Sequence, residues 1–404
     1  MNTNLMSILI KFLKKIKPLV VKFLRKIPLS DKILGIPKKR ISYEETEDYF
    51  NKIDSDSGVL KIFNKKKLFL YPPRICNRNL KGYYFKHFSE YTCENFLIHL
   101  ENARYNQRPH SIFTKENYHL AIASSHPELS IDEHIAFKKL FYSKAKIVKG
   151  TSLLLVTQDD ANYYHCLFQI PAKIWFLKKL AFDFDSIDNF ILNVNSSKFQ
   201  REIIGSLLIS HEKILDISNF KQIKLDNLIV TPTFCNPEPW MIPLLKDTFL
   251  GSFQSNAKEQ ESSSERIYIS RNKASYRRIL NENFLWSILE RFGFKYIRTE
   301  GMTIREQAVL FAKAKIIVTA HGAALANTVF CQPGTKIFEI RAFQHDFLQY
   351  NLYEHLSSIA DLKHYTLLVD GYPSQCSKNA LTFDLMIEEN QIEEIIEEFI
   401  NDNN

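Results

Sequence analysis

The stretch Lys315-Ile-Ile-Val-Thr-Ala-His-Gly-Ala-Ala-Leu-Ala-Asn327, followed by Pro333-Gly-Thr-Lys-Ile-Phe-Glu-Ile340, decides the fold of this 404-residue chain. Ile316 to Thr319 are four consecutive β-branched residues, a pattern typical of a parallel strand covered on both faces. Gly322 and the alanines after it predict a turn that opens directly into a helix. A second strand then ends near Glu339. This order predicts an open α/β sheet, in which helix N-termini hold phosphate groups.

The turn after the first of these strands is a candidate diphosphate site. Free N–H groups at the helix start and the positive end of the helix dipole attract anions, and His321 adds an imidazole at the mouth. The residues expected in this cradle are His321, Gly322, Ala323, Ala324, Leu325 and Asn327. The alternative is that small residues only let the helix pack tightly on the strand, with His321 as an ordinary polar residue.

Length and charge divide the chain into parts. A chain of 404 residues exceeds the usual size of a single hydrophobic core, so two domains are expected. The first 40 residues hold 11 Lys and Arg and one Asp, whereas the whole chain has a net charge of +8, so the remainder is close to neutral at −2. A nearly neutral body argues against nucleic-acid binding. Six cysteines without C-x-x-C spacing favour a reducing, cytosolic setting.

Residues 1–40 predict a basic amphipathic helix, with a kink at Pro18. Apolar residues recur at i, i+3 and i+4, and lysines and arginines take the other positions. Because the charges recur every few residues, this helix is expected to lie on an anionic membrane surface instead of crossing it. Lysines also interrupt the apolar core that a signal peptide needs. Docking onto a protein partner or onto the chain's own body is the alternative.

Residues 41–250 predict an α/β domain with a partly parallel sheet. Its apolar strands are expected at 152–157, 190–194 and 228–231, and its helices at 165–180 and 199–209. The serine-rich stretch 251–265 predicts a linker.

Residues 266–375 predict a doubly wound, Rossmann-like domain, because strands and helices alternate regularly with short connections. The expected strands are 266–270, 295–298, 315–319, 336–340 and 365–369, and the expected helices are 282–292, 304–314, 323–331 and 346–359. Residues 376–404 predict an acidic amphipathic helix at 386–400 that packs on the body and that could return to the first domain.

Several familiar nucleotide motifs are missing from the sequence. Eleven glycines are present and none are two residues apart, so G-x-G-x-x-G is absent, as are the P-loop and the G-x-S-x-G elbow. Dinucleotide oxidoreductases, P-loop kinases and elbow hydrolases therefore lack their signatures. A diphosphate site built on a single-glycine turn remains.

Spaced motifs appear in order between Leu153 and Ile340. They are Asn162-Tyr-Tyr-His165 before an apolar helix, Tyr268-Ile-Ser-Arg271, Arg277-Arg278, Asn281-Glu282, Phe294 to Glu300, the His321–Asn327 turn and Pro333 to Glu339. Together they resemble glycosyltransferase family 61. The resemblance implies a GT-B-like fold, two Rossmann-like domains facing a cleft, and inverting transfer from a nucleotide sugar, commonly a UDP-sugar. It also implies an acceptor that is a glycan or a lipid-linked glycan, as in capsule or O-antigen biosynthesis.

The donor is expected on the second domain. Ser270 and Arg271 follow its first strand, where a hydroxyl and a guanidinium suit phosphate oxygens. Arg277, in the next loop, is placed to reach the diphosphate. Glu339 is expected to accept ribose hydroxyls and Glu300 to face the base. For each of these, an exposed loop residue without a ligand is the alternative.

The acceptor and the catalytic base are expected on the first domain. His165 begins a helix and is a candidate general base, with Asp159 or Asp160 orienting it or replacing it. A polar contact without a catalytic role is the alternative for His165. Asn162 and Tyr164 are expected on the acceptor side. Members of the resembled family often carry an acidic residue one turn after this histidine, and here that position is Gln169.

No metal or other cofactor is expected, because arginines and a helix N-terminus can stabilise a leaving diphosphate. Asp183-Phe-Asp185 matches a metal-binding D-x-D pattern, but it lies in an acidic loop and does not end an apolar strand. The resulting hypothesis is a glycosyltransferase held peripherally at the cytoplasmic face of the membrane. A catalytically inactive scaffold of a polysaccharide assembly complex is the first alternative, and a sugar-nucleotide epimerase is the second.

Overall fold

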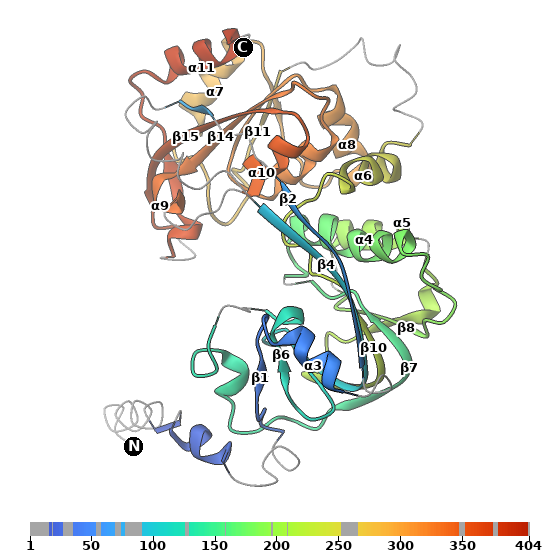
Figure 1. Ribbon diagram of the computed structural model, residues 1–404. Helices are drawn as coiled ribbons and strands as arrows, with labels where there is room; N and C mark the ends of the chain where they lie inside the picture. The colour runs from blue at the N-terminus through green and yellow to red at the C-terminus, as the bar shows by residue number, and fades with distance from the viewer. Residues whose placement is uncertain are drawn as a thin grey trace.

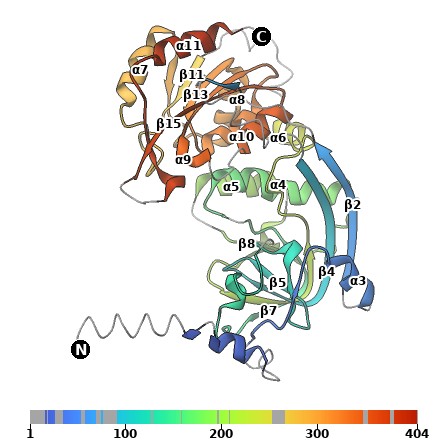
Figure 2. The same ribbon diagram turned by 60° about the vertical axis from the view of Figure 1, so that its left-hand side comes forward.

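The computed structural model describes residues 16–17, 19–26, 35–53, 58–68, 74–76, 91–125, 129–157, 159–194, 197–207, 209–251, 266–346, 352–374 and 379–402. These residues form two sheets, each with its own helices, stacked end to end (Figure 1). The helical residues 19–24 lie at the far end of the first sheet from the second (Figures 1 and 2). The mixed α/β class expected from the sequence is confirmed.

The first sheet has nine strands among the described residues, in the order β1-β6-β5-β4-β10-β7-β8-β9, with β2 beside β4. The strands are β1 (Arg40–Ile41), β2 (Gly58–Leu68), β4 (Tyr91–Asn106), β5 (Ser111–Phe113), β6 (His119–Leu120), β7 (Lys146–Leu154), β8 (Asn189–Leu192), β9 (Ile214–Asp216) and β10 (Gln222–Val230). The neighbouring strands β10, β7, β8 and β9 run parallel to one another. Strand β4 pairs antiparallel with β2, β5 and β10. The expectation of a partly parallel sheet is therefore confirmed.

Helix α4 (Tyr163–Lys179) and helix α5 (Lys198–Ser206) lie between the two sheets (Figure 2). Most of α4 is buried, including Leu167, Ile170 and Leu177, because it packs on its own sheet and on the second domain. A helix that is apolar on nearly every side is stable only when it is enclosed in this way. Shorter elements of this half are α3 (Thr46–Lys52), η3 (Ala121–Ala123), η4 (Ile135–Phe137) and η5 (His211–Lys213).

The second sheet follows the order β12-β11-β13-β14-β15-β16, with β3 beside β15. Its strands are β3 (Arg74–Ile75), β11 (Arg266–Ile269), β12 (Lys295–Ile297), β13 (Ile316–Ala320), β14 (Lys336–Ala342), β15 (Lys363–Tyr372) and β16 (Asp384–Met386). All pair parallel except β15 with β16. Every residue of β13 is buried, as its β-branched run predicts.

Helices cover both faces of the second sheet, which is the doubly wound arrangement expected. They are α6 (Met241–Phe249), α7 (Glu282–Arg291), α8 (Ile304–Lys313), η8 (Ala323–Phe330), α9 (Phe343–Asp346), α10 (Leu352–Ile359), η9 (Ala380–Thr382) and α11 (Ile392–Asn401). Apolar residues of α6, α8, η8 and α10 share one core with α4, and those of α7 and α11 fill the core on the opposite face. The predicted helix after the glycine turn is present as a 3₁₀ helix.

The structure refines the expected domain bounds. The C-terminal helix α11 packs on the body as expected, with Phe399 against Phe338 and Tyr365 at ring-centroid distances of 4.8 and 4.9 Å, and these contacts place it on the second domain. Two segments of the expected first domain, β3 and α6, lie with the second sheet and its helices. Local patterns could not place β3, because its partner strand lies almost 300 residues further along the chain.

The two halves are joined by specific hydrogen bonds as well as by the shared core. Tyr163 donates to Oδ1 of Asn327 at 2.7 Å, and the backbone N–H of Ile304 donates to Glu202 at 2.7 Å. These contacts fix α4 and α5 of the first half against α8 and η8 of the second.

The structure describes only part of the predicted basic helix. Residues 19–24 are helical and bury Val21, while Arg25 pairs with Asp132 at 3.3 Å. Residues 1–15, 18 and 27–34 of this segment, with the expected kink at Pro18, and residues 252–265 of the predicted linker lie outside the described residues. Within the described ranges, no helix is both long enough and apolar enough to cross a bilayer.

Candidate functional site

The candidate site lies where the connections of the second sheet change direction. Strand β11 has β12 on one side and β13 on the other, so the chain leaves β11 in one direction and later returns to extend the sheet in the other. Ligands of doubly wound sheets bind at the carboxyl ends of the strands at such a switch point. Arg271 follows β11, and His321 and Gly322 follow β13.

Gly322 provides space for Arg271. A Cβ atom added at Gly322 would lie 2.0 Å from Nη1 of Arg271, so the guanidinium packs directly on the glycine backbone. The φ angle of Gly322 is 171°, an extended value that any residue adopts. The need for glycine therefore comes from the arginine and not from the turn freedom expected from the sequence. Ala323 and Ala324, the first residues of η8, are partly exposed beside it.

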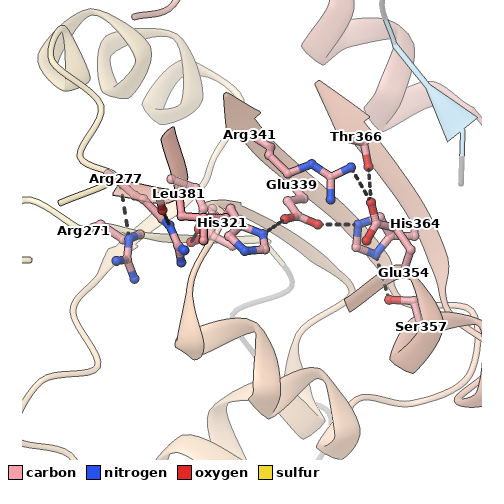
Figure 3. Close-up of polar contacts among 12 residues, drawn as sticks. Arg271, Arg277, His321, Glu339, Arg341, Glu354, Ser357, His364, Thr366 and Leu381 are labelled. Atoms are coloured by element: carbon pink, nitrogen blue, oxygen red, sulfur yellow. Dashed lines mark hydrogen bonds and ion pairs between the residues drawn. The ribbon is translucent and has the colours of Figure 1, made fainter. Parts of the chain in front are cut away.

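Two guanidinium groups lie close together at this point (Figure 3). Arg271 donates to the backbone carbonyls of Tyr276 and Arg277 at 3.3 and 3.4 Å, and Nε of Arg277 donates to the carbonyl of Leu381 at 2.7 Å. Among the described residues, no carboxylate lies within ion-pair distance of Arg271. Burial, and then repulsion from Arg277, lower the pKa of Arg271. An anion bound here would relieve that repulsion.

Behind the guanidinium pair, a chain of hydrogen bonds runs into the core (Figure 3). Nδ1 of His321 bonds to one oxygen of Glu339, and Nε2 of His364 lies 3.0 Å from the other oxygen. Nδ1 of His364 lies 2.8 Å from the hydroxyl of Ser357. Glu339 is fully buried. Burial by itself would raise its pKa, but the charge and hydrogen bonds of the two histidines outweigh that effect and lower it.

Tyr353 of α10 connects this turn to the first domain. Its ring lies 5.3 Å from that of His321 and 6.0 Å from that of Tyr164, with distances taken between ring centroids. Tyr164 in turn lies 5.4 Å from His165. Burial and the charge of Glu339 raise the pKa of Tyr353, so its hydroxyl stays protonated. His165 and His321 therefore lie on opposite sides of one aromatic contact at the junction of the two domains.

His165 lies in the first turn of α4 and is partly exposed. The helix begins there because Asn162 accepts a hydrogen bond from the backbone N–H of Tyr164 at 2.9 Å, as an N-cap residue does. Nε2 of Gln169 lies 2.8 Å from Nδ1 of His165. Burial lowers the pKa of His165, and the charges of Asp159 and Asp160 oppose this shift. A neutral imidazole is therefore favoured at neutral pH.

The comparison with protein families decides the identity. The family model described as Glycosyltransferase 61 matches residues 36–338, about three quarters of the chain. The chain belongs to the glycosyltransferase 61 family. A comparison with curated proteins gave no significant match. The matched region contains His165, Arg271 and the His321 turn, so the protein is a glycosyltransferase and these residues lie in its family-defining part.

Three residues expected to contact the donor of this glycosyltransferase have other partners. The hydroxyl of Ser270 donates to Glu282 at 2.6 Å and accepts from Tyr296 at 2.6 Å, so it holds the loop after β11. Asn327 is fully buried and accepts from Tyr163 across the domain junction. Leu325 is also fully buried, and its side chain belongs to the core. Sequence spacing placed them correctly near the turn but could not show which way they face.

The expected role of Glu339 also changes, whereas that of Glu300 does not. Both oxygens of Glu339 accept from histidines and its side chain is 0% exposed, so a ribose hydroxyl cannot reach it directly. Glu300 is exposed after β12, and its charge acts on Arg271, which places it at the same edge of the sheet. Its contact with a base stays a prediction.

The first-domain residues expected beside the acceptor of this glycosyltransferase are largely structural. Asn162 caps α4, and Tyr164 is buried with its hydroxyl donating to the carbonyl of Cys235 at 2.9 Å. Asp160 accepts from the backbone and hydroxyl of Thr157 at 3.0 and 2.9 Å and from Asn193 at 2.7 Å. These bonds fix the loop that leads to His165, and the charge of Asp160 acts on the histidine from there.

Sequence reasoning missed two residues near the junction, Tyr353 and His364. Each lies in an ordinary apolar or aromatic stretch, where its spacing carries no functional signal. Tyr163 belongs to the motif that runs from Asn162 to His165, but its contact with Asn327 could not be predicted. Arg341 and Glu354 form a further buried pair at 2.8 Å. Glu339, Glu354 and His364 have ligand atoms within 4.8 Å of one another, a spacing that suits a metal. Because Arg341 and His321 already bind the two carboxylates, the group forms an ion-pair and hydrogen-bond network.

Proposed function

We propose that this glycosyltransferase is an inverting, GT-B-type enzyme that uses a nucleotide sugar, with UDP-sugars favoured. The observation that carries the proposal is the guanidinium of Arg271, packed on Gly322 at the switch point and close to a second arginine. Guanidinium groups bind phosphate oxygens with two parallel hydrogen bonds. The first N–H groups of η8 add donors beside them. The family resemblance supports a product of the capsule or O-antigen type.

The proposed reaction divides the work between the domains. An acceptor hydroxyl attacks the anomeric carbon as the bond from that carbon to the diphosphate oxygen breaks. His165 takes the hydroxyl proton as a general base. The diphosphate leaves with the bonding electrons, and its new charge is stabilised by Arg271, Arg277 and the start of η8. Because these groups supply the positive charge, no metal is required in this proposal.

A ligand screen followed by a transfer assay tests the proposal. A nucleotide that binds the folded protein stabilises it by mass action, so thermal shifts are measured with UDP-, GDP-, CMP- and ADP-sugars. One class, expected to be UDP, should raise the melting temperature, and the stabilising sugar should then be transferred to a glycan or lipid-linked acceptor with inversion. Activity should persist in a chelator. No shift with any nucleotide would contradict the enzyme hypothesis.

Gln169 favours a second candidate, a scaffold that keeps the fold without catalysis, because a carboxylate would hold His165 in the basic tautomer more firmly than an amide does. Nucleotide binding without transfer or donor hydrolysis in the wild type would support this scaffold. An epimerase would convert the donor with no acceptor present, which product analysis detects.

We also propose that residues 1–40 hold the enzyme peripherally at the cytoplasmic face of a membrane. In the described part of this segment, Leu19 and Phe23 are 68% and 65% exposed, while Val21 anchors the helix on the body. Exposed apolar side chains among lysines suit an anionic lipid surface. The full chain should therefore co-sediment with anionic liposomes and not with neutral ones. Equal binding to both, or binding to neither, would contradict the proposal.

A further inference from the structure

The chain of hydrogen bonds behind His321 takes no part in the steps of the proposed reaction. It runs from Ser357 on α10 through His364 on β15 and Glu339 on β14 to His321 after β13 (Figure 3). The first three residues are 1%, 7% and 0% exposed. They lie behind His321, which is itself 5% exposed. His321 lies beside the ring of Tyr353 and directly before Gly322, on which the guanidinium of Arg271 packs.

The positions of the hydrogen atoms in this chain of hydrogen bonds follow from the atoms that can only accept. An ionised carboxylate only accepts hydrogen bonds. Because Glu339 is held in its ionised form, Nδ1 of His321 and Nε2 of His364 must both carry a hydrogen. Nδ1 of His364 then meets the hydroxyl of Ser357, which can donate or accept a hydrogen bond. Both carboxylate oxygens of Glu339, both ring nitrogens of His364 and the hydroxyl of Ser357 are hydrogen-bonded in this arrangement.

We propose that Glu339, His364 and Ser357 are positioning residues that fix the ring orientation and the Nδ1–H tautomer of His321, so that its Nε2 contacts the donor diphosphate beside Arg271. This inference rests on the proposed function. A side chain whose partner is itself fixed by further hydrogen bonds keeps its geometry better, as outer partners do at other protein sites. His321 thereby differs from Arg271, whose hydrogen bonds within the described residues go to backbone carbonyls.

The neighbouring ion pair provides a contrast within the same core. Arg341 and Glu354 are each 1% exposed and lie 2.8 Å apart, and Thr366 bonds to the same carboxylate at 3.4 Å. That pair ties β14, β15 and α10 together and ends in the core. The chain of hydrogen bonds through Glu339 connects the same three elements but ends at the switch-point turn. The neighbouring pair therefore already supplies the structural connection between β14, β15 and α10.

The test uses two variants and a matched control in the full chain. Glu339→Gln replaces an oxygen acceptor by an amide donor, so the two histidines can no longer both present N–H groups to this side chain. Ser357→Ala removes only the last partner and keeps every charge, so it serves even where Glu339→Gln fails to fold. Ser152→Ala, a buried serine in the first sheet, controls for loss of a buried hydroxyl. The readouts are melting temperature, UDP affinity by calorimetry, and the ¹⁵N spectrum of labelled histidines.

In the wild type, the ¹⁵N signals of His321, assigned by comparison with His321→Gln, should show the Nδ1–H tautomer. Glu339→Gln should give a tautomer mixture and weaken UDP binding about 10-fold. Ser357→Ala should cause a smaller change of the same kind, and Ser152→Ala should cause none. Folded variants with unchanged His321 signals and unchanged UDP affinity would overturn the inference. A wild type that binds no nucleotide would instead contradict the proposed function, and the tautomer readout would still test the positioning role.

Discussion

Replacing Arg271 by alanine is expected to lower kcat/KM for the nucleotide sugar about 100-fold to 1,000-fold, the range found when one preorganised donor to a developing charge is removed. The guanidinium is held by two backbone carbonyls and packs on Gly322, so it is fixed before the donor arrives. It has no carboxylate partner among the described residues that would compete with a phosphate. Steady-state kinetics with the donor identified by thermal shift, together with UDP affinity, measure the effect.

Three further variants separate charge from position. Arg271→Lys keeps the charge but loses the planar fork, so it should recover only part of the activity. Gly322→Ala keeps the arginine, but the new Cβ would lie 2.0 Å from Nη1 and displace it, so UDP affinity should fall in this variant as well. Arg291→Ala removes an exposed arginine that pairs with Glu393 on the outer face, and it should change nothing in the kinetics. Wild-type UDP affinity in folded Arg271→Ala would refute the assignment.

The parts of the fold that could be predicted from sequence are those set by local patterns. The β-branched run before His321 forms the fully buried strand β13, and Thr303 and Glu306 form the capping box that starts α8. Contacts between distant segments could not be predicted. Strand β3 is two residues long and adds to a sheet whose other strands begin at residue 266. Strand β4 alternates buried residues such as Phe96, Ile98 and Leu100 with less buried ones, but its partner β10 begins more than 100 residues further along the chain.

For the candidate site too, local features could be predicted and contacts between distant segments could not. The sequence located the turn, the arginine after β11 and the histidine at the start of α4, because strand ends and helix starts are local features. The direction of each side chain depends on its neighbours in space. Glu339 faces inward because two histidines from other segments surround it, and Asn327 faces the first domain because Tyr163 meets it there. No local pattern carries that information.

Replacing His165 by alanine is expected to lower kcat about 100-fold to 10,000-fold with little change in UDP affinity, because a general base acts on the acceptor and not on the nucleotide. The pH dependence of kcat/KM shows which protonation state of His165 is active. Burial lowers the pKa of His165 from its ordinary value of 6.5, so the base stays neutral to below that pH. The wild-type kcat/KM should therefore fall only as pH decreases below 6.5, when the imidazole becomes protonated, and His165→Ala should lose this acidic limb.

Gln169→Glu tests the same assignment from the other side of the ring. Nε2 of Gln169 lies 2.8 Å from Nδ1 of His165, and an amide can serve that nitrogen either as a donor or, after rotation, as an acceptor. A carboxylate accepts only, so it selects the Nδ1–H tautomer, leaves Nε2 as the base, and stabilises the imidazolium that forms. The acidic limb should move to higher pH, whereas Gln332→Glu on the exposed surface should leave it in place. An acidic limb that persists in His165→Ala and does not move in Gln169→Glu would assign the base to another residue.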